Sequence, residues 1–551
     1  MAKKKLLLCN CPDLQVDLNA VLAALTDEDV QAQVLAPCCT PRGLARLQDL
    51  LAADPQAYVL AACGPELSSR FFRLLTDLQT PVVDLWAWRD PVAAASELLL
   101  AATGAQPQPP PLRVGHQAVL VIGGGVGGCE TALDLAKAGI KVYLLDESLS
   151  IGGTMAKLDK TFPTLDCSIC ILGPKLVEVA NHPNIELLTY AQVKSIRGGP
   201  GNFLVDITLK PRYVDMSKCV GCGSCAEVCP VIVASRWNLG MKPRKCIRII
   251  FAQAVPLRAT IEKDFCIDCR LCAKTCGRQA INLDDVPRSR HLQVGAVVLA
   301  TGATPFDPTI KSEYGYGRLP QVLTNLEFER LVCASGPTLG ALVTPSGKPV
   351  RRLAFIQCVG SRDRRFLPYC SGYCCTASIK EAMLALEHDA AIEVTIFYND
   401  IRTSGKGFEE LYLRAQEAGV RFIKALPGRV EADAQGRPVV IYHELGRGRQ
   451  ALAVDLVVLA VGLEGPKQLP PLGEGMPVRD DYGFLQSLHP LLHPVEASLP
   501  GVFLVGTCLG PQDIAETVCQ ASGAAGRVLR FLAPLAPFAA GNNVTGGGQE
   551  A

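Results

Sequence analysis

Two runs of four cysteines in the sequence share one spacing. Both read C-x2-C-x2-C-x3-C: KCVGCGSCAEVCP holds Cys219, Cys222, Cys225 and Cys229, and FCIDCRLCAKTCG holds Cys266, Cys269, Cys272 and Cys276. This spacing is typical of 4Fe–4S clusters, and in two-cluster ferredoxins the fourth cysteine of each run binds the other cluster. We therefore expect Cys276 to complete the first set and Cys229 the second, with the clusters close enough to exchange electrons. A zinc ribbon would use CxxC pairs instead of quartets.

A third cysteine group lies in residues 357–375, QCVGSRDRRFLPYCSGYCC. The stretch sits between an apolar run and a run with helical spacing, at the turn where a nucleotide-binding unit has glycines. Its thiols could hold another 4Fe–4S cluster, whose negative charge nearby arginines would balance; they are Cys358, Cys370, Cys374 and Cys375, with Arg362, Arg364 and Arg365. Chance clustering and a structural zinc site are the alternatives.

The N-terminal region carries cysteines after three expected strands. Cys9 and Cys11 follow the first, Cys38 and Cys39 the second, and Cys63 the third. Because parallel strands end at the same edge of a sheet, four of these thiols could bind a cluster there. We favour Cys9, Cys11, Cys63 and one of the adjacent pair, assigned here to Cys38. The alternative is buried thiols that pack as small hydrophobic groups.

A glycine turn predicts dinucleotide binding. Gly123, Gly125 and Gly128 fit GxGxxG between an apolar strand and a helix, with Gly127 beside them, and Asp146 ends the next strand. Such glycines let a pyrophosphate approach the helix N-terminus, and the acid accepts hydrogen bonds from a ribose. A glycine turn used only for packing is the alternative.

FAD is the favoured dinucleotide. The order of the later motifs resembles flavoproteins with two dinucleotide domains, such as thioredoxin and glutathione reductases; these motifs contribute Gly152, Gly153, Thr301, Gly302, Gly506 and Asp513. The closing turn reads Gly506-Thr507, where that family has Gly-Asp, which leaves the contacts to the flavin ribityl chain open.

A CxxC pair, Cys167 and Cys170, lies in TFPTLDCSIC. Dithiols near this place in flavin disulfide reductases exchange electrons with the flavin, so we assign a catalytic redox role to the pair. Contact with a partner or metal and plain packing are the alternatives.

The composition suits a large globular protein. The 551 residues are 49% apolar and 19% charged, with a formal net charge of +1 and 24 cysteines. The charge does not favour a nucleic-acid partner, and CxxC spacings in a long chain favour metal or redox sites in a reducing cytoplasm. The start, MAKKKLLLCN, has too short an apolar core for an export signal. We expect a cytoplasmic protein with no direct membrane span, since no run reaches about 18–20 apolar residues.

The strands and helices expected around the cysteine groups and the glycine turn predict an α/β fold with an insertion. We expect a thioredoxin-reductase-like flavoprotein of two dinucleotide domains, with an inserted two-cluster ferredoxin domain (α+β) and an N-terminal α/β iron–sulfur domain. The expected parts are the iron–sulfur domain 1–103, a linker 104–113, an FAD-binding domain in three pieces (114–215, 288–345 and 466–535), the ferredoxin insert 216–287, a second Rossmann-like domain 346–465 and a disordered tail 536–551.

Several long segments resemble the family of A-type subunits of heterodisulfide reductase. They include TFPTLDCSICILGPKLVEVANHPNIELLTY, the double cysteine block, IQCVGSRD with YCSGYCC, and GTCLGPQDIAETVCQASGAA. The resemblance spans nearly the whole chain and implies FAD in a thioredoxin-reductase-like domain, an inserted two-cluster ferredoxin, a cluster at the second nucleotide-like turn and an N-terminal cluster domain. Many members carry another two-cluster ferredoxin after the flavin domain, and this chain stops instead.

The resemblance implies an electron-transfer component of a heterodisulfide-reductase-like complex. We expect it to bifurcate electrons between a donor subunit, ferredoxin and a disulfide or quinone-linked acceptor. The implied partners are B- and C-type subunits, a donor subunit linked to hydrogenase or formate dehydrogenase, and ferredoxin, with the protein itself forming a homodimer. The alternatives are a relay without bifurcation in a membrane-associated, quinone-interacting oxidoreductase, and a stand-alone NAD(P)H-dependent disulfide reductase using Cys167 and Cys170.

Overall fold

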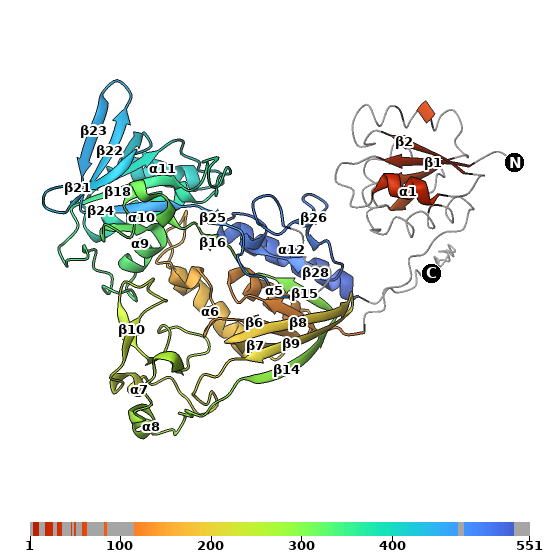
Figure 1. The fold of residues 1–551 in the computed structure, drawn as a ribbon, viewed down its shortest axis with the longest axis horizontal. Helices are drawn as coiled ribbons and strands as arrows, with labels where there is room; N and C mark the ends of the chain where they lie inside the picture. The colour runs from red at the N-terminus through yellow and green to blue at the C-terminus, as the bar shows by residue number, and fades with distance from the viewer. Residues whose placement is uncertain are drawn as a thin grey trace, which may run out of the picture. The chain divides into compact units, whose positions relative to one another are not determined.

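The chain forms two units, which are described separately. The computed structural model describes residues 4–9, 17–25, 30–35, 46, 49–50, 58–62, 82–84, 98, 115–471 and 479–533. One unit comprises Met1–Leu112 with His489–Leu492, and the other comprises Arg113–Leu488 with His493–Ala551 (Figure 1).

The N-terminal unit contains a four-stranded parallel sheet in the order β2-β1-β3-β4. Its elements are β1 (Lys4–Cys9), α1 (Leu18–Ala24), β2 (Val30–Leu35), β3 (Tyr58–Ala62) and β4 (Val82–Asp84). Leu6, Leu7 and Leu8 are fully buried, which makes β1 the core strand. Cys9 pairs with Leu35, so β1 and β2 end at the same edge of the sheet.

The larger unit is built around a seven-stranded sheet in the order β26-β27-β28-β15-β5-β6-β7. The strands β28, β15, β5, β6 and β7 run parallel, and β27 is antiparallel to β28. The bounds are β5 (Val119–Ile122), β6 (Val142–Asp146), β7 (Ile185–Thr189), β15 (Ala296–Leu299), β26 (Ser487–His489), β27 (His493–Ala497) and β28 (Val502–Leu504).

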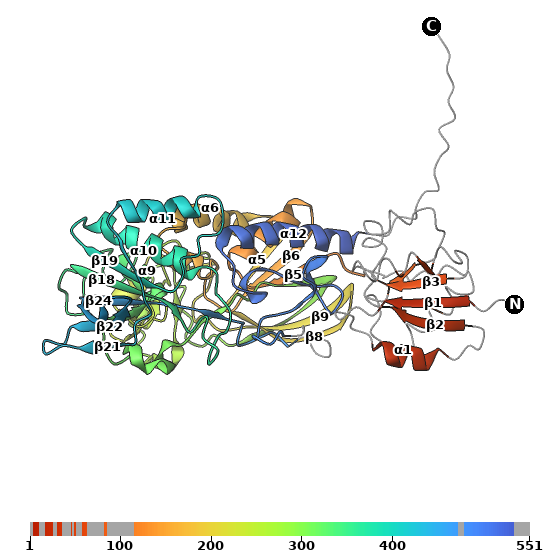
Figure 2. The ribbon, with the colours of Figure 1, turned by 90° about the horizontal axis from the view of Figure 1, so that it is seen from above.

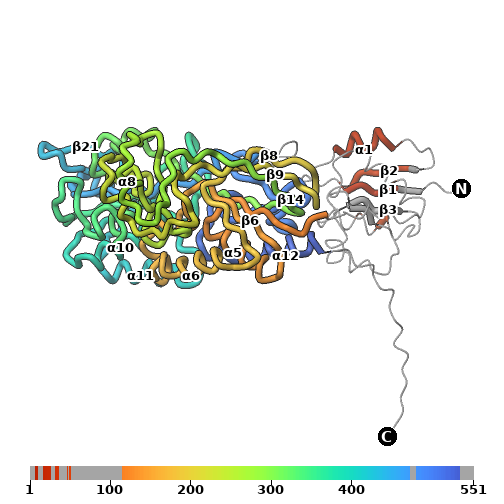
Figure 3. The backbone as a smooth tube through the Cα atoms, turned by 90° about the horizontal axis from the view of Figure 1, so that it is seen from below, coloured from red at the N-terminus to blue at the C-terminus, as the bar shows by residue number. Residues whose placement is uncertain are grey.

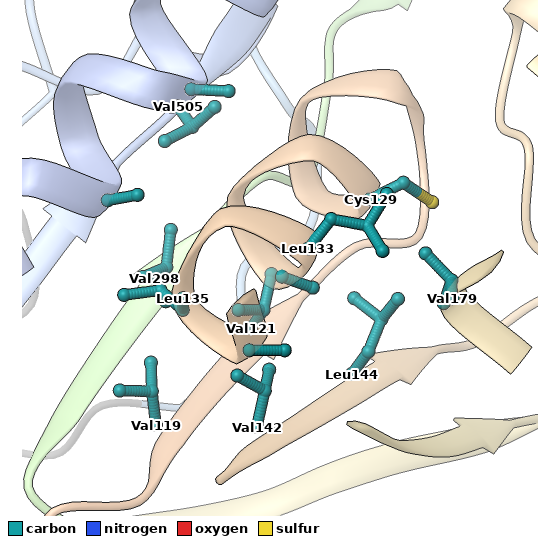
Figure 4. Close-up of a cluster of buried hydrophobic side chains, with 14 of the residues drawn as sticks. Val119, Val121, Cys129, Leu133, Leu135, Val142, Leu144, Val179, Val298 and Val505 are labelled. Carbon is teal, nitrogen blue, oxygen red and sulfur yellow. The ribbon is translucent and has the colours of Figure 1, made fainter. Parts of the chain in front are cut away.

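Both faces of this sheet are covered (Figure 2). Helices α5 (Val126–Lys137), α6 (Ser168–Asn181) and α12 (Ile514–Leu532) cover one face, and a sheet in the order β14-β9-β8 covers the other. Because side chains alternate along a strand, β5 is apolar on both sides. Val119 and Val121 pack with the helices (Figure 4), and Leu120 with Ile122 packs on the opposite face.

A cysteine-rich lobe is inserted between two neighbouring strands, β9 (Asn202–Leu209) and β14 (Arg288–Val294), and β9 also pairs with β8 (Ala191–Gly199). Leu209 pairs with Arg288, so the chain leaves and re-enters the sheet at one place. The lobe is closest to the viewer from below (Figure 3) and contains α7 (Ser224–Glu227), β10 (Ile232–Ala234), β11 (Pro243–Lys245), β12 (Ile247–Arg248), β13 (Thr260–Ile261) and α8 (Leu271–Thr275).

A second parallel sheet carries the residues after 320, with strands in the order β17-β24-β18-β19-β20. Its elements are β17 (Val322–Thr324), α9 (Asn325–Val332), β18 (Arg352–Val359), α10 (Cys374–His388), β19 (Glu393–Tyr398), α11 (Phe408–Glu417), β20 (Arg421–Lys424) and β24 (Leu456–Val461). An antiparallel sheet of β21 (Arg429–Ala432), β22 (Pro438–Glu444) and β23 (Gly448–Ala453) follows β20, and β16 (Thr304–Pro305) pairs with β25 (Leu463–Glu464).

The predicted α/β fold class is confirmed by this architecture. The strand–turn–helix–strand unit around residues 357–375 is present as β18, α10 and β19. The domain boundaries remain predictions. Within the described ranges, every helix is too short or too polar to cross a membrane.

Substituting Gly128 by Ala should destabilise the larger unit, because the added Cβ would lie 1.8 Å from the carbonyl oxygen of Gly123. We expect Gly128→Ala to lower the free energy of unfolding by about 1–3 kcal/mol, as overpacking does. Gly125→Ala is the matched control in the same turn, since its Cβ would meet nothing within 4 Å. Urea denaturation of both variants without added cofactor checks this, and equal losses would contradict it.

Candidate functional site

A cavity of about 830 Å³ lies between the glycine turn after β5 and helix α10. Its volume falls within the range of about 300–1,000 Å³ that is common for small-molecule and cofactor pockets. Nine of the eleven residues predicted to bind a cofactor line it: Gly123, Gly125, Gly127, Asp146, Gly153, Thr301, Gly302, Gly506 and Asp513. The structure thus brings together residues from segments spread over almost 400 positions.

The other two predicted glycines have packing roles beside the cavity. Gly128 lets α5 approach the carbonyl of Gly123 closely. Gly152 has φ +122°, in the left-handed region that favours glycine, and a Cβ there would lie 2.8 Å from the side chain of Ala156. Both positions shape the cavity wall without lining it.

The glycine turn forms an open cradle at the N-terminus of α5. Gly125 is the N-cap of this helix, and no side chain caps it. A Cβ added at Gly125 would meet nothing within 4 Å, and Gly125, Val126 and Gly127 of this helix end line the cavity. A helix N-terminus of this kind suits a phosphate group, and the residues present therefore fit the pyrophosphate of a dinucleotide.

Asp146, at the end of β6, is fixed by its own turn. Its carboxylate accepts hydrogen bonds from the backbone N–H of Gly124, at 2.6 Å, and of Ser148, at 2.7 Å. These bonds hold the acid at the cavity wall, in the place expected for a ribose contact.

Asp513 has a structural role in addition to its place on the cavity. It caps α12 by accepting a hydrogen bond from the N–H of Glu516, at 2.8 Å, and Glu516 accepts the N–H of Asp513 in return, at 2.9 Å. This capping box explains the position and the hydrogen bond of the Asp513 carboxylate without a ligand. Gly506, with φ +80°, forms the turn that precedes it.

The opposite wall of the cavity contains residues that sequence reasoning missed. They come from α9, from α10 and from the residue before it, and include Asn325, Glu327, Glu329, Tyr373, Ala377, Lys380 and Glu381. The segment ASIKEAMLALEH predicted only a helix. The sequence feature that could have indicated a role for Lys380 and Glu381 is their place on the same helix as Cys374 and Cys375.

Three of these residues form a buried charged cluster. Lys380 forms an ion pair with Glu329, and both side chains are 2% exposed. The Lys380 ammonium also donates to the carbonyl oxygen of Lys160, at 3.0 Å, and Glu329 accepts the backbone N–H of Asp159, at 2.9 Å. Burial and the neighbouring charge of Glu329 raise the pKa of Glu381 well above its usual value.

The four cysteines of residues 357–375 also come together. Cys374 and Cys375 begin α10 and are each 6% exposed. Burial, followed by the charge of Cys375, raises the pKa of Cys358 to about 11, and the pKa of Cys374 is raised by burial and then by the charges of Cys358, Cys375 and Cys370. Each thiol lies within electrostatic reach of the others, which fits a thiolate donor set for an iron–sulfur cluster.

Cys358 reaches this group through an irregular strand. The pairing of β18 with β24 shifts register between Ile356 and Val359, and Cys358 has φ +59°. A left-handed non-glycine residue at a β-bulge is strained, and bulges of this kind re-aim side chains beside functional sites.

Of the three predicted arginines, Arg362 is the one that faces the thiols. Its charge offsets part of the rise in the pKa of Cys358, and its guanidinium donates to Asp400 at 2.7 Å. Arg365 pairs with Asp363 at 2.8 Å, and Arg364 is exposed.

The lobe brings its two cysteine runs into contact. Burial raises the pKa of Cys225 to about 11, with further contributions from the charges of Cys219, Cys222, Cys272 and Cys276. The pKa of Cys272 is raised by burial, and the charges of Cys266, Cys269 and Cys229 add to the effect. Cys276 therefore lies near the first run and Cys229 near the second. Across the described residues, no three His, Cys, Asp or Glu side chains converge as ligands of a single metal ion.

A fifth cysteine borders the second set. Cys246 lines a small cavity together with Cys229, Cys266, Cys269 and Cys272. It is 1% exposed, and its thiol donates to the carbonyl oxygen of Glu262 at 3.1 Å. Because it belongs to neither run, its isolated position in the sequence indicated a structural thiol.

Cys9 is buried at the end of β1. The other predicted N-terminal ligands, Cys11, Cys38 and Cys63, lie outside the described residues.

Cys167 and Cys170 are joined by a disulfide at the start of α6. The bond closes a hairpin in which Cys167 pairs with Lys160, the residue whose carbonyl binds Lys380. Cys167 is half-buried and Cys170 is exposed, and neither is among the described residues that line the large cavity. The structure thus separates this pair from the cavity and connects it to the cavity wall through Lys160.

Comparison with known proteins places these features in a family. The family model of pyridine nucleotide-disulphide oxidoreductases matches residues 117–331. The chain is 43% identical over 539 residues to the A component of H(2):CoB-CoM heterodisulfide,ferredoxin reductase of Methanothermobacter thermautotrophicus, over 93% of this chain and 82% of that protein. It is 36% identical to the A component of ferredoxin:CoB-CoM heterodisulfide reductase of Methanosarcina mazei, over 94% of this chain and 69% of that protein. Thioredoxin reductase of Lactococcus lactis matches 76% of this chain and 99% of its own, with 16% identity and a TM-score of 0.44.

Proposed function

Because this chain belongs to the family of A-type subunits of heterodisulfide reductase, which are components of an oxidoreductase, we propose that it transfers electrons within a multisubunit complex through FAD and iron–sulfur clusters. The proposal depends above all on one observation. Helix α10 begins with two cysteines of a four-thiol group, and the same helix lines the cavity whose other wall is the glycine turn.

FAD would bind in this cavity. Gly123, Gly125 and the N-terminus of α5 would hold the pyrophosphate, and Asp146 would position the adenosine ribose. Thr301, Gly302 and Gly506 would border the rest of the cofactor. Bound FAD supplies redox chemistry that exchanges either one or two electrons. The chain's own residues orient it and place the buried cluster of Lys380, Glu329 and Glu381 beside it.

Four sets of cysteines would hold 4Fe–4S clusters. The first two are the crossed sets of the lobe, Cys219, Cys222, Cys225 and Cys276, and Cys266, Cys269, Cys272 and Cys229. The third is Cys358, Cys370, Cys374 and Cys375, and the fourth is the N-terminal group of Cys9, Cys11, Cys38 and Cys63. Clusters of this type supply one-electron transfer, and the exposed apolar residues Val220 and Ile267 beside the lobe's cysteines suit a partner surface.

In the more specific form of this proposal, the protein bifurcates electrons. It would divide an electron pair between ferredoxin and a disulfide or quinone-linked acceptor, in the cytoplasm and together with B- and C-type subunits, as a homodimer in a larger complex. The donor subunit would be linked to hydrogenase or formate dehydrogenase. The names of the relatives from Methanothermobacter thermautotrophicus and Methanosarcina mazei, which combine heterodisulfide and ferredoxin, support this form.

The Cys167–Cys170 disulfide would act as a redox-active pair outside the cavity. Its exposure and its place at a helix N-terminus favour thiol–disulfide exchange. A stand-alone NAD(P)H-dependent disulfide reductase is the weaker candidate, because the second turn holds cysteines where a nicotinamide nucleotide would bind.

Replacing both Cys374 and Cys375 by Ser should remove one cluster and leave FAD bound, because the glycine turn is on the other wall. We expect the chain to lose about four of roughly sixteen irons and one cluster EPR signal, with an unchanged flavin content. Iron and acid-labile sulfide analysis of anaerobically purified protein checks this. The control is Cys519→Ser, an exposed cysteine outside all four sets, and unchanged iron in the double variant would refute the third set.

The intact complex, purified without oxygen, should couple ferredoxin reduction to reduction of its high-potential acceptor. The expected result is that omitting ferredoxin slows turnover of the acceptor, since both electrons of a pair must leave. Full turnover of the acceptor without ferredoxin would indicate an electron relay without bifurcation. Oxidation of NAD(P)H by the isolated chain would indicate a stand-alone disulfide reductase instead.

Treating the folded protein with a dithiol should release two thiols, those of Cys167 and Cys170, without unfolding it, because the disulfide is at the surface. Mass spectrometry after alkylation counts the thiols, and Cys167→Ser/Cys170→Ser gives the baseline. A disulfide that resists reduction until the protein unfolds would indicate a purely structural bond.

A further inference from the structure

A flavin that is reduced by iron–sulfur clusters obtains its proton in a different way from a flavin that is reduced by a nicotinamide. A hydride carries its hydrogen along with its electron pair, whereas an iron–sulfur cluster delivers electrons alone. If the proposed function is correct, the protein must supply a proton whenever the flavin is reduced through clusters. A group that can hold a proton should therefore lie beside the cavity.

Glu381 is such a group. It lies on α10, seven residues and hence about two helical turns after Cys374. Its side chain is 1% exposed, and it lines the cavity opposite the glycine turn. A carboxyl group in this position is next to both the cofactor site and the helix end that carries the thiols.

The charges around Glu381 favour its protonated form. Glu329, on α9, shares a hydrogen bond with it and carries the negative charge that pairs with Lys380. The third titratable group that faces Glu381 is Tyr373, at the start of α10. The Oε2 atom of Glu381 has no hydrogen-bond partner among the described residues. A buried carboxyl group without a cation of its own stays neutral, because ionisation in a site of low polarity is costly.

The neighbouring proton donors are already committed to other acceptors. The Lys380 ammonium is held by Glu329 and by the carbonyl oxygen of Lys160. The Tyr373 hydroxyl donates to the carbonyl oxygen of Val461 at 2.7 Å. The other unpartnered oxygen that the structure describes on this wall is the amide Oδ1 of Asn325, which cannot carry an acidic proton. Among the titratable side chains of the wall, Glu381 is therefore the one with an available oxygen.

We propose that Glu381 is the proton donor and acceptor of the flavin site, and that it operates when electrons arrive from or leave to the clusters. Two single electrons from reduced iron–sulfur clusters and one proton from Glu381 give the singly protonated reduced flavin. The O–H bond of Glu381 breaks, an N–H bond forms on the flavin ring, and Glu381 remains as a carboxylate. Glu381 stays a carboxylate while the flavin is reduced, and it takes the proton back when the flavin is oxidised through the clusters.

The test compares Glu381→Gln with Glu387→Gln in the full anaerobic protein with FAD and clusters. Glutamine keeps the size and hydrogen bonding of Glu381 but cannot donate an acidic proton. Glu387 is on the same helix and forms a surface ion pair with Lys160, so its variant controls for loss of a carboxylate. Reduced-minus-oxidised infrared spectra should show loss of a protonated-carboxyl band in the wild type and in Glu387→Gln, and this band should be missing in Glu381→Gln.

A second readout is the rate of flavin reduction after rapid mixing with a one-electron donor. We expect Glu381→Gln to slow it by about 10²-fold, the lower end of what general acids contribute, and Glu381→Asp to restore part of the rate. Wild-type rate and an unchanged carboxyl band in Glu381→Gln would overturn the proposal.

The flavin content separates this inference from the proposed function. A Glu381→Gln protein that binds FAD, accepts electrons from its clusters and keeps the wild-type rate and carboxyl band refutes the role of Glu381 alone. A wild-type chain that binds no FAD refutes both. Circular dichroism and FAD stoichiometry establish that each variant is folded, and Glu381→Asp provides the test if the glutamine variant is not.

Discussion

A single buried ion pair holds the cavity together. Lys380 on α10 and Glu329 on α9 bind each other, and both also bind the backbone of residues 159–160, which belong to the segment before α6. Three segments that together span 220 positions of the chain thus meet at one point. Taking two charges out of water is expensive, and leaving one of them unpaired costs several kcal/mol. The wall formed by α9 and α10 is therefore tied to the segment before α6 by charges and hydrogen bonds as well as by apolar packing.

The two nucleotide-type turns of the larger unit share a frame and differ in content. After β5 the turn has glycines, an uncapped helix end and open space, which suit phosphate groups. After β18 the corresponding turn is filled by side chains: the hydroxyl oxygens of Ser361 and Ser371 lie 2.6 Å apart, and Tyr369 donates to the carbonyl oxygen of Leu463. The second turn thus has polar side chains and thiols where the first has glycines and open space. Tyr373, which follows the second turn, lines the same cavity as the glycine turn.

The sequence predicted the parts of this structure that depend on local spacing. The strands, the glycine turn, the cysteine runs and the helix of residues 377–388 all follow from patterns that neighbouring residues create. The positions of Lys380 and Glu381 could not be predicted, because only the tertiary fold buries charged residues that look like a solvent-facing helix surface. The place of Cys246 beside the second cysteine set could not be predicted for a similar reason, since packing within the lobe brings it there. The bulge at Cys358 depends on the register with β24, which no local pattern specifies.

The insertion point of the lobe has a consequence for how the chain folds. Leu209 and Arg288 must pair to complete the β14-β9-β8 sheet, although about 80 residues separate them. Closing a flexible loop of that length costs about 4 kcal/mol of chain entropy, which delays the pairing. A lobe that has already folded brings its two ends together in advance and removes much of this cost. This topology favours an order in which the insert folds before the sheet closes around it.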